Sequence, residues 1–297
     1  MNTPLNKLSN ILRILHVPNH FKVSMELLNG SNMNTYQHMY PPTPLIGGAK
    51  KTNEIVEYKG AKFVFYYYGD EYSMQYVLHP RDDSATRCLI ILVDIVGKHV
   101  VLHGVTYDET CFEDHKCKVF ANEWNGSTLL KISFILIKQL KAKYELNYIV
   151  LTDNSIKYCK AGKQIDLDSF LMLTTGNTWY GKYGFVPYDK VHEITDKLNF
   201  RDYKNNKKIV STILLKNTNI KKIILRKIYK HKLNFSLNEI ETTLTKHEEK
   251  NRTVMNCLKD LTRQYDRTCE IFYHCYQDIM IDLKMKNLHG IMYWKKL

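Results

Sequence analysis

The chain has 297 residues, of which 44% are hydrophobic and 25% are charged. A chain of this length can bury a sizeable core, and its composition excludes a disordered polymer. No run of about 18 apolar residues occurs, so we expect no transmembrane helix and no membrane partner. The formal net charge is +13. Between Arg201 and Lys232 eleven Lys or Arg residues stand against one acid, which indicates a partner such as nucleic acid or an acidic protein surface, or else a solvated basic surface.

Residues 1–55 predict a short amphipathic helix, with Leu5, Leu8, Leu12 and Leu15 at helical spacing, followed by a Pro- and Gly-containing connector. This pattern is not that of a signal peptide. Seven scattered cysteines without a Cys-x-x-Cys pair predict free thiols in a reducing compartment. We therefore expect an intracellular, cytoplasmic protein. The frequent Lys, Asn, Ile and Tyr are typical of an AT-rich genome, such as that of a large DNA virus or an AT-rich parasite. A viral origin would place the protein in the host cytoplasm or the virion.

The middle of the chain predicts a mixed domain at residues 56–217. Apolar residues at helical spacing predict helices at 128–144 and 167–174. Segments rich in β-branched and aromatic residues predict strands at 61–69, 72–80, 88–97, 98–108, 117–121, 147–152 and 208–216.

Residues 218–297 predict a basic segment and a helical extension. Ser236 and Glu239 form a capping-box pattern. Apolar residues then recur at spacings of three and four from Leu237 to Ile279, which fits either one long helix or a helical hairpin. The apolar seam packs on the same chain or mediates self-association as a coiled coil.

The segment TWYGKYGFVPYD (178–189) combines five aromatic residues with two glycines. Gly184 suits the left-handed position at a helix end, Phe185 can serve as the hydrophobic anchor after it, and Pro187 prevents continuation. Together with the order of elements over residues 60–216, Trp179–Phe185 resembles a signature of the GNAT superfamily of N-acetyltransferases. The resemblance implies an α+β fold, with a central mixed sheet flanked by helices and here a helical C-terminal extension.

The resemblance also implies site residues. Tyr180 matches a tyrosine that protonates the leaving thiolate, or it only fills the core. Asp153 follows the strand 147–152, where the family's strands splay apart around the cofactor, and is either a general base or a helix and turn cap. Acetyl-CoA is the implied cofactor, with its pyrophosphate at a helix N-terminus. The implied cofactor-binding residues are Val119, Ala121, Asn125, Gly126, Ser127, Thr128 and Asn154.

The loop before the long helix departs from the family pattern. It reads Asn122-Glu123-Trp124-Asn125-Gly126-Ser127-Thr128, and it lacks the basic first residue and the second glycine. Two functions therefore stay open. One is an acyl-CoA-dependent N-acyltransferase with an unidentified amine acceptor. The other is a catalytically inactive GNAT-fold binding or structural protein, viral if the composition reflects its origin, that contacts nucleic acid or a protein through Lys221, Lys222, Arg226 and Lys227.

The sequence contains few local patterns with the spacing of a metal site. Cys111, His115 and Cys117 lie within seven residues, but a structural zinc site needs four ligands, commonly in two pairs. Cys269 and Cys275 do not share one face of the predicted helix. We therefore expect no metal.

Overall fold

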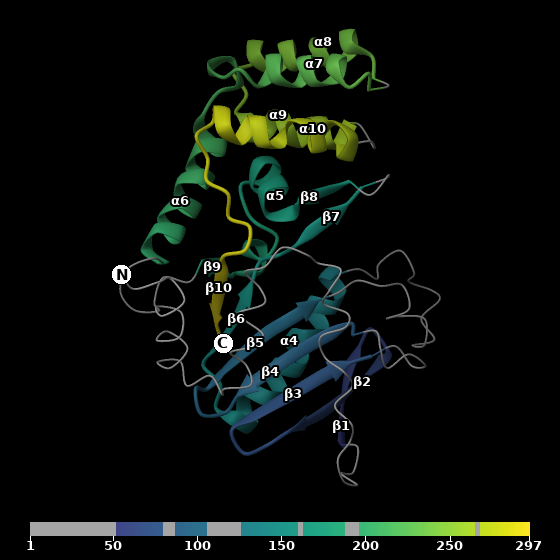
Figure 1. The fold of residues 1–297 in the computed structure, drawn as a ribbon, viewed down its shortest axis with the longest axis vertical. Helices are drawn as coiled ribbons and strands as arrows, with labels where there is room; N and C mark the ends of the chain where they lie inside the picture. The colour runs from purple at the N-terminus through teal and green to yellow at the C-terminus, as the bar shows by residue number, and fades with distance from the viewer. Residues whose placement is uncertain are drawn as a thin grey trace, which may run out of the picture. The chain divides into compact units, whose positions relative to one another are not determined.

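The computed structural model describes residues 52–79, 87–105, 126–159, 163–187, 196–233, 235–264 and 268–297. The predicted N-terminal helix and connector, apart from the connector's last residues, and the predicted strand 117–121 lie outside these ranges. The chain divides into two compact units, Met1–Val150 with Lys296–Leu297, and Leu151–Lys295. Each unit is described by itself below (Figure 1).

Unit 1 is an antiparallel series of strands with one long helix. Alternate residues of the second strand, such as Phe63 and Phe65, are fully buried while Lys62 is exposed, as expected for a strand with one face on a core. The helix α4 lies against the sheet and buries Leu129, Ile132 and Leu136 (Figure 1). The elements are β1 (Thr52–Tyr58), β2 (Ala61–Gly69), β3 (Ser73–Leu78), β4 (Leu89–Asp94), β5 (His99–Val105), α4 (Gly126–Tyr144) and β6 (Tyr148–Thr152), whose last residues belong to unit 2.

The connection from β5 through α4 to β6 produces a parallel pair of strands. β5 and β6 pair over only three residues each, from His99↔Tyr148 to Val101↔Val150, although β5 continues to Val105. The register of β5 against β4 shifts where Ile90 faces Gly104 and Ile91 faces Leu102. One extra residue on β5 therefore bulges where the pairing with β6 has ended, and such a bulge bends a strand.

Unit 2 is mainly helical. Its apolar core is formed by residues from β8, from the inner faces of the six helices α5–α10, and from the segment before β10. The pair α7 and α8 forms one layer and α9 and α10 the next (Figure 1). The elements are β7 (Ile156–Tyr158), β8 (Gln164–Asp166), α5 (Leu167–Thr175), η5 (Gly181–Tyr183), β9 (Val186–Pro187), α6 (Asp196–Thr212), η6 (Leu215–Asn217), α7 (Ile220–Lys230), α8 (Leu237–Glu249), α9 (Val254–Gln264), α10 (Thr268–Asp282) and β10 (Met292–Lys296).

The described strands give an α+β fold with one mostly antiparallel sheet in the order β1-β2-β3-β4-β5-β6-β10-β9, and a separate β7-β8 hairpin. β10 pairs antiparallel with β9, with Tyr293 opposite Pro187 and Trp294 opposite Val186. The division between the units falls within β6 and within β10. The chain therefore leaves the sheet after β9 and returns to it only at β10.

The predicted strand at 208–216 is wrong. Its first residues belong to α6, which ends at Thr212, and Leu215–Asn217 is a short 3-10 helix. Tyr203, Asn206 and Val210 are buried at spacings of three and four, which is the period of a helix face. β-branched residues in this segment favour a strand locally, but packing on α5 and α9 decides for a helix.

The C-terminal extension also differs from a single long helix. It forms three helices, α8, α9 and α10, and ends in β10, which the sequence pattern did not predict. The seam residues Ile240, Leu244, Leu258 and Ile279 are fully buried in the core of unit 2, so the seam packs on its own chain. Self-association stays a prediction. The predicted N-cap is confirmed, because Ser236 Oγ accepts a hydrogen bond from the Glu239 N–H at 3.3 Å.

The cysteines fall into two groups. Cys88 and Cys159 each take part in a disulfide bond, so the prediction of free thiols is wrong for these two. Cys257 and Cys275 are buried free thiols, and burial raises the pKa of each to about 12.

Among the described helices, none has the length and apolar character needed to cross a membrane.

Candidate functional site

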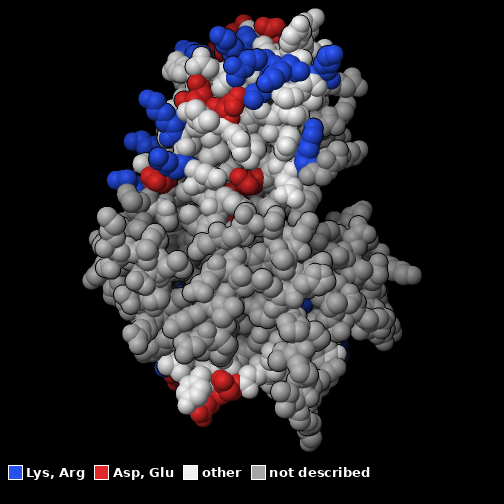
Figure 2. All heavy atoms as spheres, viewed as in Figure 1, with Lys and Arg blue, Asp and Glu red and all other residues white. Residues whose placement is uncertain are grey.

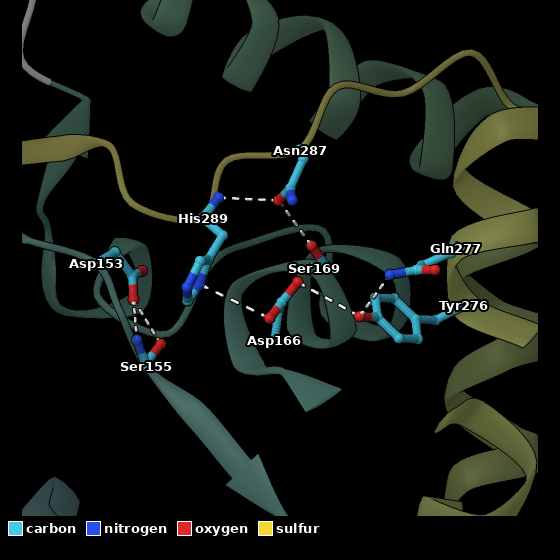
Figure 3. A network of polar contacts seen from close by, with 8 residues as sticks. All are labelled: Asp153, Ser155, Asp166, Ser169, Tyr276, Gln277, Asn287 and His289. Carbon is cyan, nitrogen blue, oxygen red and sulfur yellow. Dashed lines mark hydrogen bonds and ion pairs between the residues drawn. The ribbon is translucent and has the colours of Figure 1, made fainter. Parts of the chain in front are cut away.

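Asp153 lies directly after β6, and hydrogen bonds hold its backbone N–H, its carbonyl oxygen and one of its carboxylate oxygens. Its backbone N–H donates to Ile291 O at 3.0 Å and its carbonyl accepts from the Gly290 N–H at 2.8 Å. Its Oδ1 accepts from the backbone N–H of Ser155, at 3.1 Å, and from the Ser155 hydroxyl (Figure 3). This supports the predicted turn, but the strand β7 follows it instead of a helix, so the predicted helix cap is wrong. Asp153 Oδ2, however, is buried without a hydrogen-bond partner among the described residues, and burial raises the pKa of the carboxyl group.

Asp166 and Asp168 flank the start of α5, and sequence reasoning did not single them out. The Asp168 side chain is fully buried, and neither carboxylate oxygen has a hydrogen-bond partner in the described part of the chain. Burial, and next the charge of Asp153, raise the pKa of Asp168 to about 7. Asp166 Oδ2 accepts from Tyr276 Oη at 3.4 Å, and Asp166 Oδ1 lies 3.8 Å from His289 Nδ1. Unit 2 therefore holds three carboxylates and a histidine close together.

The segment Thr178–Pro187 has the predicted conformation. Gly184 has φ +86°, and its N–H donates to Gly181 O at 3.0 Å. Phe185 is fully buried after it, and β9 begins at the next residue. The helix that ends here is the 3-10 turn η5, because α5 already stops at Gly176. The left-handed glycine and the aromatic anchor are confirmed.

Tyr180 lies inside this aromatic segment and is only 7% exposed. Its ring packs edge-on against Trp179, with centroids 4.5 Å apart, and against Phe185, at 5.9 Å. Burial, with a contribution from the charge of Asp153, raises the pKa of Tyr180 above its ordinary value. The side chain thus fills the core, and the charge of the Asp153 carboxylate also acts on its hydroxyl group.

Replacing Gly181 by Ala is expected to lower the free energy of unfolding by about 1–3 kcal/mol. A Cβ there would lie 2.1 Å from Asn177 Oδ1 and 3.0 Å from Tyr203 Oη. These two atoms share a hydrogen bond of 2.6 Å, so neither can move away freely. Urea denaturation measures the change. Gly104→Ala is the matched control, because its Cβ would meet nothing closer than 3.8 Å; equal stability of the two variants would contradict the expectation.

The predicted cofactor-binding residues are distributed over both units. Val119, Ala121 and Asn125 lie outside the described residues. Gly126, Ser127 and Thr128 form the first turn of α4, which contains no acidic residue. Asn154 belongs to unit 2, is exposed, and follows Asp153.

The predicted contact residues Lys221, Lys222, Arg226 and Lys227 all lie on α7. Lys221 Nζ lies 3.2 Å from Glu248, while Arg226 and Lys227 both pair with Asp278, at 3.2 and 2.9 Å. Lys222 is exposed and forms no ion pair with the described residues. Figure 2 shows Lys and Arg side chains gathered over α7 and α8. Three of the four predicted charges are therefore partly neutralised by this chain's own acids.

Comparison with known proteins gives no relative. No family model, no curated protein and no solved structure matches the chain. The candidate site must therefore be judged on its own geometry and chemistry.

Proposed function

We propose that the protein is an acyl-CoA-dependent N-acyltransferase of the GNAT type, acting on an amine that the geometry does not specify. The observation that carries the proposal is the brief parallel pairing of β5 and β6. After Val101↔Val150 the ladder ends, although β5 continues for four residues and bulges there. Ligands of α/β sheets bind where neighbouring parallel strands part at their carboxyl ends. Asp153 and Asn154 follow the carboxyl end of β6.

The start of α4, in unit 1, fits the pyrophosphate of an acyl-CoA. The first turn of α4 has no acidic side chain, so the dipole of the helix favours a pyrophosphate at its N-terminus. Acetyl-CoA, when bound, supplies an acyl group activated as a thioester. The proposed role of Tyr180 is to hold a proton at Oη for the departing thiolate. The proposed role of Asp153 is to accept the proton that the attacking amine loses.

Ser127→Glu tests this proposal at the α4 N-terminus. A carboxylate in the first turn favours the helix through its dipole, so the variant should fold. The same charge repels a pyrophosphate, and we expect affinity for acetyl-CoA to fall about ten-fold or more in calorimetry. Lys138→Glu, on the exposed face of the same helix, is the control. Equal affinities of the two variants would count against a pyrophosphate at this turn.

A second candidate, binding of nucleic acid by the basic helices, rests on the exposed cations of α7. Reversal of four charges there, at Lys221, Lys222, Arg226 and Lys227, should weaken binding to duplex DNA. It should also reduce the slope of log K against log salt by about 1 for each residue that contacts a phosphate. Filter binding or fluorescence anisotropy between low and physiological salt measures both.

The control for this second candidate reverses four charges on α4, at Lys131, Lys138, Lys141 and Lys143. The set is matched, because Lys143 also pairs with an acid of this chain, Glu54, at 3.8 Å. If both fourfold variants bind DNA equally, α7 is not the contact surface and only net charge matters.

A further inference from the structure

Three side chains of unit 2 present potential metal ligands to one another. One carboxylate oxygen each of Asp166 and Asp168 and one ring nitrogen of His289 all lie within 4.8 Å of one another. Ligands that share one ion at bonds of about 2.1 Å stand roughly 3–4 Å apart. Small side-chain movements would therefore bring all three onto a common centre.

The Asp168 side chain requires a positive partner. It is fully buried, and both of its oxygens lack a hydrogen bond among the described residues. The backbone N–H groups of Asp168 and Ser169 favour its charge but do not reach hydrogen-bond geometry. No Lys or Arg in the described ranges forms an ion pair with Asp153, Asp166 or Asp168. A buried carboxylate without a partner is costly, so a proton or a cation must compensate it.

The surrounding contacts orient the other two side chains as ligands. Tyr276 Oη donates to Asp166 Oδ2 and itself accepts from Gln277 Nε2 at 3.3 Å, which leaves Asp166 Oδ1 directed at His289 (Figure 3). His289 Nδ1 has no hydrogen-bond partner in the described part of the chain. Outer contacts of this kind fix the orientation of metal ligands in known sites.

The segment that carries His289 is also fixed from both ends. Asn287 Oδ1 accepts from the His289 N–H at 2.9 Å and from Ser169 Oγ at 3.5 Å, which ties the segment to α5 (Figure 3). The backbone of Asp153 holds Gly290 and Ile291. The ring nitrogen of His289 is thus positioned over the start of α5 by residues other than the ligands themselves.

We propose that Asp166, Asp168 and His289 form a binding site for a divalent transition-metal ion, with Zn²⁺ or Mn²⁺ as the ions that fit it. Two carboxylates and one imidazole suit these ions, whereas Ca²⁺ and Mg²⁺ prefer sets of oxygen ligands alone. Three protein ligands leave at least one position for water. The site joins the start of α5 to the segment before β10, and the proposal does not depend on acyl transfer.

The test is calorimetric titration of the full chain, freed of metal by chelation, with Zn²⁺ and separately with Mn²⁺. We expect wild type to bind at least one equivalent of one of these ions, and Ca²⁺ and Mg²⁺ at least about ten-fold more weakly. Asp168→Asn and His289→Gln should each lose one equivalent. Tyr276→Phe, which removes only the outer contact to Asp166, should weaken binding about ten-fold.

His247→Gln is the matched control. His247 also lies 3.8 Å from an aspartate, Asp260, but belongs to no cluster of three ligands in the described residues. It should keep the wild-type stoichiometry, and circular dichroism verifies that all variants fold. No binding by wild type, which would leave a proton as the partner of Asp168, overturns the proposal. So does unchanged stoichiometry in folded Asp168→Asn and His289→Gln.

Discussion

Replacing Tyr180 by Phe is expected to lower turnover with acetyl-CoA by about 100-fold or more, while the affinity for acetyl-CoA changes little. The substitution removes only the hydroxyl group and keeps the ring between Trp179 and Phe185. The phenol is protonated at neutral pH and has a proton to give to the thiolate as it forms. Burial and the charge of Asp153 raise the pKa of Tyr180, so the proton leaves only when a base such as the thiolate is beside it. Release of free CoA thiol, with an acceptor amine found by screening, measures the rate.

Tyr183→Phe is the control for this prediction. Tyr183 lies in the same segment, and its ring also packs edge-on against Trp179, with centroids 6.1 Å apart, but it is partly exposed. Its loss of a hydroxyl should leave turnover near wild type. If Tyr180→Phe retains the wild-type rate, Tyr180 only fills the core and has no part in the reaction.

Replacing Phe185 by Ala is expected to lower the free energy of unfolding by about 3–5 kcal/mol. Phe185 is fully buried, packs edge-on against Tyr180, and lies under Lys295 Nζ at 5.8 Å from its ring centroid. Its removal leaves a cavity at the turn that leads from η5 to β9. Urea or thermal denaturation monitored by circular dichroism gives the change.

Tyr229→Ala provides the comparison, since this side chain is 78% exposed on α7. It should change stability by no more than about 0.5 kcal/mol. A Phe185→Ala variant as stable as Tyr229→Ala would mean that Phe185 is not the anchor of its segment.

Local patterns predicted much of unit 1 and the start of unit 2. The strands β2 and β4 alternate more and less buried side chains, and α4 carries a broad apolar face. Each of these elements is therefore indicated by its own local sequence. The conformation at Gly184 and Phe185 was also predictable, because a left-handed glycine followed by an apolar residue is a local signal.

The errors have a common physical cause in contacts between distant segments. The segment 208–216 contains enough β-branched residues for a strand, but its burial on α5 and α9 requires a helix face. β10 is short and pairs with β9, more than a hundred residues earlier, so nothing near it in sequence indicates a partner. The helices α8 and α9 end at Glu249 and Gln264. The spacing of the apolar residues does not show that the segment folds into three separate helices.

The candidate metal ligands illustrate the same limit. Asp166 and Asp168 stand two residues apart at the start of α5, where acidic residues commonly favour the helix dipole. His289 follows far along the chain, in a segment without regular structure. Only the folded unit 2 brings the three groups within 4.8 Å of one another. No spacing rule in the sequence contains that information.

Calorimetric titration of wild-type protein with acetyl-CoA tests the central proposal most directly. An acyltransferase whose cofactor binds where β5 and β6 part, with its pyrophosphate at α4, should bind acetyl-CoA saturably at one site per chain. Free CoA should compete for that site. No detectable binding at millimolar acetyl-CoA would contradict the proposed function.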